Sequence, residues 1–114
     1  MIACFADTFY YLALLNENDS AHEEAERISR ACRGPIVTTA WVLTEVADAL
    51  ATPPARDVFL SLLDLLRNDA KVIVVSATQE WFDRGVSLYR QRSDKAWSLT
   101  NCISFSIMTE LRLW

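Results

Sequence analysis

Glycine and histidine are scarce in this sequence, which has two glycines and one histidine among its 114 residues. A phosphate-binding loop needs several glycines, because their backbone N–H groups must approach the phosphate closely. Gly34 and Gly85 stand alone, so a nucleotide-binding loop of that kind is excluded. The single histidine, His22, gives no support to a nucleophilic triad built on a histidine base.

Long apolar runs are also lacking. None approaches the roughly 20 residues that a membrane-spanning helix needs, so no membrane partner is expected. The first residues contain no basic segment and reach an acid at Asp7, which is unlike a signal peptide. The three cysteines (Cys4, Cys32 and Cys102) are odd in number and have no Cys-x-x-Cys spacing. We therefore predict three reduced thiols in a cytoplasmic protein.

Basic charge is in deficit, because 11 Lys and Arg face 15 Asp and Glu, for a formal net charge of −4. Non-specific binding of nucleic acid depends mainly on neutralising phosphates, and an acidic chain is poorly suited to it. The same charge fits a divalent cation held by carboxylates, or a basic partner. Four cations nevertheless cluster in one stretch of the chain: Arg84, Arg90, Arg92 and Lys95.

The chain has the length of one small domain, residues 1–114. Short apolar runs rich in β-branched residues predict three strands, at residues 2–6, 36–39 and 72–75. Apolar periodicity and capping residues (Asp7, Ser20, Ser76 and Ser98) predict helices between and after them, at residues 9–15, 20–33, 40–51, 54–66, 77–89 and 99–113. Strands that alternate with helices predict an α/β domain with a parallel sheet, in which functional groups gather at the carboxyl ends of the strands.

Three polar residues lie near a strand end or in an early helix turn. Asp7 directly follows the first strand, Glu45 lies beside an apolar stripe in the helix after the second strand, and Asn101 opens the last helix. Each has an ordinary alternative, since Asp7 and Asn101 could only cap helices and Glu45 could form a structural ion pair. Asp48 is a second candidate acid on the helix of Glu45. Together, two carboxylates and an amide are oxygen ligands suited to Mg²⁺ or Mn²⁺.

Three segments resemble the PIN-domain ribonucleases, especially the VapC-like toxins of bacterial toxin–antitoxin pairs: FADTFYYLA (5–13), VTTAWVLTEVADAL (37–50) and WSLTNCISF (97–105). The resemblance implies a three-layer α/β/α fold, Mg²⁺- or Mn²⁺-dependent hydrolysis of RNA, and an antitoxin protein as partner. Asp7 matches the family's first acid and Glu45 the second, whereas Asn101 stands where the family has Asp. The fourth acid, two further strands and a last helix would follow Trp114, so the sequence is interpreted as C-terminally truncated.

Two functional hypotheses follow from this resemblance. The first is a PIN-like endoribonuclease of reduced activity, with Asp7, Glu45 and Asn101 as catalytic metal ligands and the four clustered cations as RNA contacts. The second is a catalytically inactive PIN-fold module for binding or dimerisation. A truncated sheet would leave residues 2–6 at an open edge, which predicts a homo-oligomer or a partner segment there. Trp114 is a further candidate for an exposed apolar contact.

Overall fold

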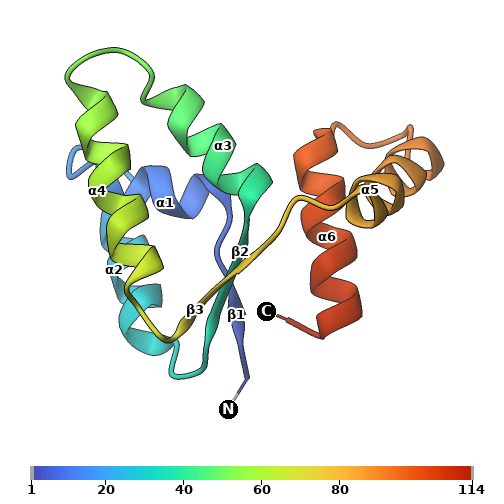
Figure 1. Cartoon of the computed structure of the whole chain (residues 1–114), viewed down its shortest axis with the longest axis horizontal. Coiled ribbons are helices and arrows are strands. Elements are labelled where there is room, and N and C mark those ends of the chain that lie inside the picture. Colours follow the sequence, from blue (N-terminus) through green and yellow to red (C-terminus); the bar gives the residue numbers. More distant parts are fainter. Residues whose placement is uncertain (1, 114) are drawn as a thin grey trace.

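A computed structural model describes residues 2–113 (Figure 1). The expected Trp114 contact therefore lies outside the described residues. Within these residues, three strands and six helices follow one another: β1 (Cys4–Phe5), α1 (Thr8–Leu15), α2 (His22–Ala31), β2 (Ile36–Thr39), α3 (Ala40–Ala49), α4 (Ala55–Arg67), β3 (Val72–Val75), α5 (Gln79–Gln91) and α6 (Leu99–Leu111).

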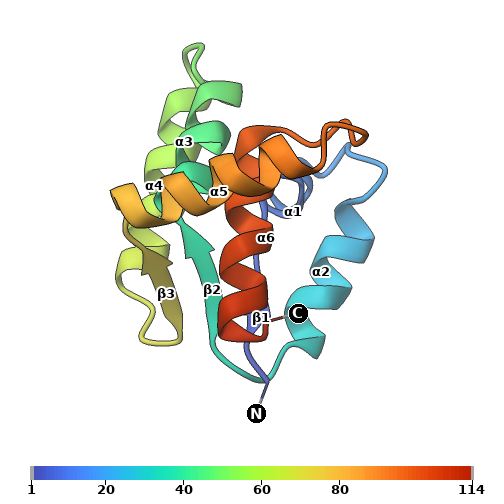
Figure 2. The same ribbon diagram turned by 90° about the vertical axis from the view of Figure 1, so that its right-hand side faces the viewer.

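The strands form a parallel sheet in the order β1-β2-β3 (Figure 2). Cys4 pairs with Ile36 and Phe5 with Val37, whereas β2 and β3 pair over four residues each. β1 is shorter than the predicted strand 2–6, because only two of its residues align with β2. The sheet confirms the predicted α/β class.

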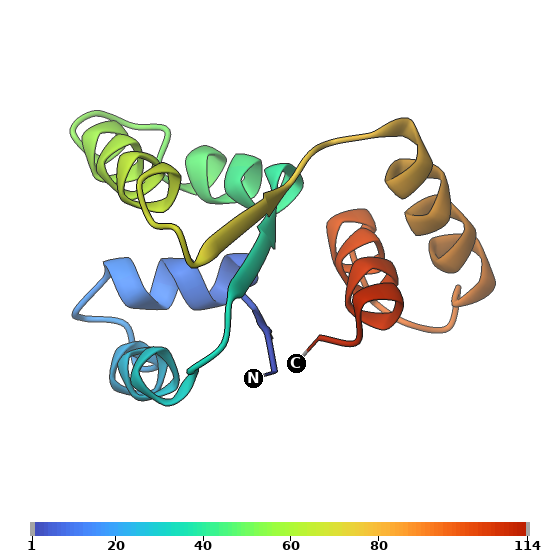
Figure 3. The same cartoon turned by 60° about the horizontal axis from the view of Figure 1, so that its bottom comes forward.

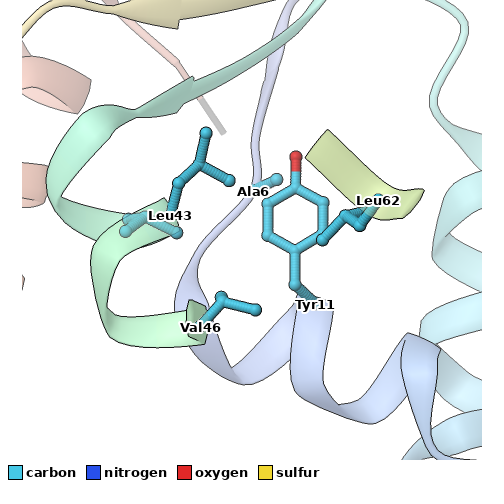
Figure 4. Close-up of a cluster of buried hydrophobic side chains, with 6 residues drawn as sticks. Ala6, Tyr11, Leu43, Val46 and Leu62 are labelled. Carbon is cyan, nitrogen blue, oxygen red and sulfur yellow. The ribbon is translucent and has the colours of Figure 1, made fainter. Parts of the chain in front are cut away.

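Helices cover both sides of the sheet (Figure 3). The helices α1, α2, α3 and α4 lie on one side, and α5 and α6 form a pair on the other. The main apolar core lies under α1, α3 and α4 and consists of Ala6, Tyr11, Val42, Leu43, Val46 and Leu62 (Figure 4). No helix of residues 2–113 is long and apolar enough to cross a membrane.

Side-chain caps begin four of the helices. Asp7 accepts a hydrogen bond from the Tyr10 amide at the start of α1, and Ser98 accepts one from the Asn101 amide at the start of α6, as predicted. The predicted Ser20 cap of α2 is wrong, because the helix begins at His22 and its N-cap position is Ala21, one residue after Ser20. The Asp19 carboxylate accepts a hydrogen bond from the Ala21 amide in the preceding turn. Thr78 rather than Ser76 caps α5, since it stands next to the first helical residue.

The prediction of three reduced thiols is wrong for two of them. Cys4 in β1 and Cys32 at the end of α2 form a disulfide, with their Cα atoms 6.4 Å apart. The chain must return from α2 to pair β2 with β1, and this return brings the end of α2 beside Cys4. Spacing along the sequence does not reveal such a contact. Cys102 is a free, buried cysteine, and burial raises the pKa of its thiol.

Candidate functional site

A cleft of about 320 Å³ lies at the carboxyl ends of β1 and β2, where α1, α3 and α6 meet. The three residues that the sequence singled out all line it: Asp7, Glu45 and Asn101. They come from three different elements and are separated by up to 94 positions along the chain, so tertiary folding is what brings them together. The remaining lining consists of hydroxyl-bearing residues and apolar side chains: Thr8, Ser98, Thr100, Ser104, Phe9, Leu12 and Val42.

Asp7 is exposed at the N-terminus of α1. Its Oδ1 accepts a hydrogen bond from the Tyr10 amide at 2.8 Å, which holds the carboxylate at the N-terminal end of α1. The capping role left open from the sequence is therefore present. This single hydrogen bond leaves the carboxylate able to bind other groups, because each of its two oxygens can accept further hydrogen bonds. Asp7 thus caps the helix and also faces the cleft.

Glu45 is half-buried in the second turn of α3. The Thr8 hydroxyl donates a hydrogen bond of 2.6 Å to its Oε1, and this bond joins the start of α1 to α3. Val42, Leu43 and Val46 anchor α3 in the core and set the direction of Glu45. The hydrogen bond to Thr8 argues against the alternative role of Glu45 in a structural ion pair, because its partner is a neutral hydroxyl. Asp48, the second candidate acid, is exposed and does not line the cleft.

Asn101 belongs to a reciprocal capping box at the start of α6. The backbone N–H of Asn101 donates to the Ser98 hydroxyl at 3.0 Å, and the side-chain Oδ1 of Asn101 accepts from the backbone N–H of Ser98 at 3.1 Å. The ordinary capping role is thus occupied here as well. One lone pair of Oδ1 and the side-chain NH₂ group remain for other contacts.

Asp7 and Glu45 are the two carboxylates of the cleft, and within residues 2–113 no three His, Cys, Asp or Glu side chains form a group that could hold a metal ion. Mg²⁺ keeps several waters in proteins and is often bound by one or two carboxylates together with substrate phosphates. The donor set therefore fits such a cation, although with less negative charge than a four-acid site. All its contributions are hard oxygen ligands, which suit Mg²⁺ or Mn²⁺ rather than softer metals.

The four predicted RNA contacts lie outside this cleft, on α5 and the turn that follows it. Arg84 lies between Glu80 and Glu110, at 3.3 and 3.6 Å, and its guanidinium lies 5.0 Å from the centre of the Trp81 ring. Arg92 pairs with Asp94 at 3.0 Å. Two of the four cations are thus engaged within the chain, while Arg90 and Lys95 are exposed.

Sequence reasoning missed the hydroxyl groups of the cleft, above all Thr8. Its position directly after Asp7 was visible, but Thr is common at helix starts and carries no signal of its own. Only the contact with Glu45, 37 positions away, gives it a role at the site.

Neither a protein-family model nor a curated protein matches this sequence. Among solved structures, the chain is similar to VapC20 of Mycobacterium tuberculosis, described as a Sarcin-Ricin loop cleaving toxin. The TM-score is 0.87, and the match covers 96% of this chain and 84% of that chain at 20% sequence identity. The two chains share one fold. The predicted PIN-like α/β/α class is therefore confirmed, while identity at this level carries no activity across.

Proposed function

We propose that this protein is a PIN-like, Mg²⁺- or Mn²⁺-dependent endoribonuclease of reduced activity. The observation that supports it most is the cleft at the carboxyl ends of β1 and β2, which is lined by both Asp7 and Glu45. Two carboxylates at such a junction, on the fold of a VapC toxin, favour metal-assisted hydrolysis over other chemistry. In this proposal RNA is the substrate and an antitoxin protein is the partner.

Each residue of the cleft has a separate task in the proposed reaction. Asp7 and Glu45 would hold the cation, and Thr8 fixes the orientation of the Glu45 carboxylate. Asn101 would be the weak third ligand through its side-chain oxygen. When bound, the cation activates water and offsets charge on the scissile phosphate.

The N-terminus of α6 supports the same assignment, because Ser98, Thr100 and Asn101 of its first turn line the cleft. First-turn N–H groups and the helix dipole favour a negatively charged phosphate at this end. Arg90 and Lys95, exposed near this region of the sequence, remain proposed contacts to the RNA backbone, with Arg84 and Arg92 available only after their ion pairs open.

The state of Asn101 favours a second candidate function, a catalytically inactive PIN-fold binding module. An amide replaces the third negative charge, and its oxygen is already shared with the Ser98 amide. Loss of one unit charge at contact distance weakens cation binding by about 1 to 4 kcal/mol, depending on the effective dielectric constant. A site weakened in this way could keep its binding surfaces without cleaving RNA.

One experiment separates the two functions. The purified chain, its Asp7→Ala variant and its Asn101→Asp variant are incubated with RNA, with and without Mn²⁺. An active nuclease cleaves in Mn²⁺ and loses cleavage in Asp7→Ala. If neither the natural chain nor Asn101→Asp cleaves any RNA, the nuclease proposal is wrong and the binding module stands.

The Asn101→Asp variant restores a third acid without disturbing the helix start, because a carboxylate can still accept the Ser98 amide and suits the positive end of the helix dipole. We expect Mn²⁺ affinity, measured by titration calorimetry, to rise by roughly fivefold or more. The matched control is Asn18→Asp, the same substitution at an exposed asparagine outside the cleft. Equal gains in both variants would mean that net charge, not a third ligand, is responsible.

A further inference from the structure

The disulfide between Cys4 and Cys32 joins two elements that are otherwise held independently. Cys4 in β1 already donates its amide hydrogen to the Pro35 carbonyl at 2.9 Å, and Ala6 donates to Val37 at 2.9 Å. β1 therefore keeps its place in the sheet without the sulfur–sulfur bond. The disulfide therefore acts mainly on α2, the helix that ends next to Cys32.

α2 packs mainly against α1 and buries little of its own surface. Ala25 is its single buried residue, and its outer face carries charged side chains. The side chains of α2 form hydrogen bonds with one other element, α1. The Ser29 hydroxyl is hydrogen-bonded to the Tyr10 hydroxyl, and His22 Nδ1 is hydrogen-bonded to the Ala13 carbonyl oxygen at 2.8 Å. The disulfide is the covalent tie between the end of α2 and the sheet.

An apolar groove of about 290 Å³ runs between β1, α1 and α2, and the disulfide forms part of its wall. Phe5 and Phe9 line one side, and Ala25 and Ile28 line the other. Because Cys4 belongs to one wall and Cys32 to the other, their bond fixes the width of the groove at this end.

We propose that Cys4 and Cys32 form a thiol–disulfide exchange site that fastens α2 to β1 when oxidised and releases it when reduced. The groove is then narrow and fixed in the oxidised protein, and its α2 wall is mobile in the reduced protein. The expected reagent is a low-molecular-weight thiol such as glutathione. This inference does not depend on RNA cleavage.

Glutathione is the reductant for this exchange, and no other co-reactant is needed. A glutathione thiolate attacks one sulfur of the Cys4–Cys32 bond, the other sulfur leaves as a thiolate and takes up a proton, and a mixed disulfide forms. A second glutathione thiolate attacks the mixed disulfide, which releases the protein thiol and oxidised glutathione. Oxidised glutathione drives the same steps in reverse.

Three observations favour an exchangeable bond over a buried structural one. Cys4 and Cys32 are both only half-buried, so a small thiol can reach them. The apolar core of α1, α3 and α4 does not include either cysteine, so the fold does not rest on their bond. Cys102 is 1% exposed and does not compete for exchange.

Limited trypsin digestion tests the release of α2. The oxidised chain, the chain reduced with glutathione, and a Cys4→Ser/Cys32→Ser double variant are digested, and cleavage is followed by mass spectrometry. Arg27 and Arg30 lie within α2 and report its opening, whereas Arg90 in α5 is the internal control. We expect cleavage in α2 to be about tenfold or more faster in the reduced chain and in the double variant, with cleavage at Arg90 unchanged.

Alkylation and circular dichroism of the same samples complete the test. The proposal requires two additional alkylated cysteines after glutathione treatment, an unchanged helical spectrum, and restored α2 protection after oxidised glutathione is added. Failure of the disulfide to form under oxidised glutathione overturns it. So does a bond that yields to glutathione only on global unfolding, or equal digestion of α2 in both states.

Discussion

Among single residues, Thr8 has the clearest consequence for the proposed site, because its hydroxyl is the donor that holds Glu45 Oε1. Thr8→Val keeps the size of the side chain and removes this donor. A hydrogen bond to a charged group is worth about 1.5 to 3 kcal/mol, so we expect Mn²⁺ affinity to fall by roughly tenfold. Titration calorimetry measures the affinity.

The control for Thr8 is Thr8→Ser, which retains the hydroxyl and should bind Mn²⁺ like the natural chain. A purely structural role would instead lower the melting temperature of Thr8→Val and leave its affinity for Mn²⁺ intact. That result would remove Thr8 from the site.

Tyr11 is the second residue with a measurable signature. It is 2% exposed, and burial followed by the neighbouring Tyr10 raises its pKa to about 12, while the Thr38 side chain beside its hydroxyl opposes this rise. Between pH 10 and 12 the unfolded chain releases this proton while the folded chain keeps it. The free energy of unfolding therefore falls as the pH rises through this range.

At pH 11 we expect Tyr11 to lower the free energy of unfolding by about 1.4 kcal/mol relative to pH 8. Tyr11→Phe removes this loss and should change stability at pH 8 by no more than about 1 kcal/mol, which is the usual net contribution of one neutral hydrogen bond. Urea unfolding at the two pH values gives the comparison, with Tyr89→Phe, an exposed tyrosine of α5, as the control. An equal alkaline loss in Tyr11→Phe would contradict the assignment.

At the scale of elements, the pairing of α5 with α6 depends on Gly85. A Cβ atom at this position would lie 2.2 Å from Cγ1 and 3.1 Å from Cα of Ile103, which is itself fully buried in α6. The absence of a side chain thus allows the two helices to approach closely. This pair forms the layer opposite the main core, and α6 carries Asn101 into the cleft.

We expect Gly85→Ala to lower the free energy of unfolding by about 1 to 3 kcal/mol, because overpacking outweighs the gain in helix propensity. Urea unfolding measures it, and Ser87→Ala on the exposed face of the same helix is the control. A stabilised Gly85→Ala protein would show that α5 can move away from α6 freely.

At the scale of the whole molecule, β1 forms one edge of the three-stranded sheet. Cys4 and Ala6 direct their amide hydrogens toward β2, so strand alternation directs the Phe5 amide to the open side. An open edge is a template for a strand from another chain, and the predicted homo-oligomer would use it.

Hydrogen exchange at single amides tests this edge. We expect the Phe5 amide to exchange more slowly as protein concentration rises, while the Cys4 and Ala6 amides stay protected throughout by their bonds to Pro35 and Val37. Light scattering on the same samples reports the mass. Fast exchange at Phe5 at every concentration, together with a monomeric mass, would argue against pairing along β1.

The sequence by itself determined the order and type of the elements. Alternating β-branched runs and amphipathic segments require strands and helices in turn, and such a chain buries its apolar faces only as a parallel sheet covered on both sides. The position of Asp7 after a strand, and the positions of Glu45 and Asn101 in early helix turns, followed from the same pattern. Caps next to a helix, such as Asp7 and Ser98, were also predictable because their hydrogen bonds are local.

Tertiary structure alone decided the contacts between distant positions. The bond from Thr8 to Glu45, the disulfide from Cys4 to Cys32 and the approach of Gly85 to Ile103 each join residues that no local pattern relates. Hydrophobic periodicity fixes which face of an element is buried, but not which residue of another element it meets. Those contacts depend on how whole helices and strands pack around the sheet.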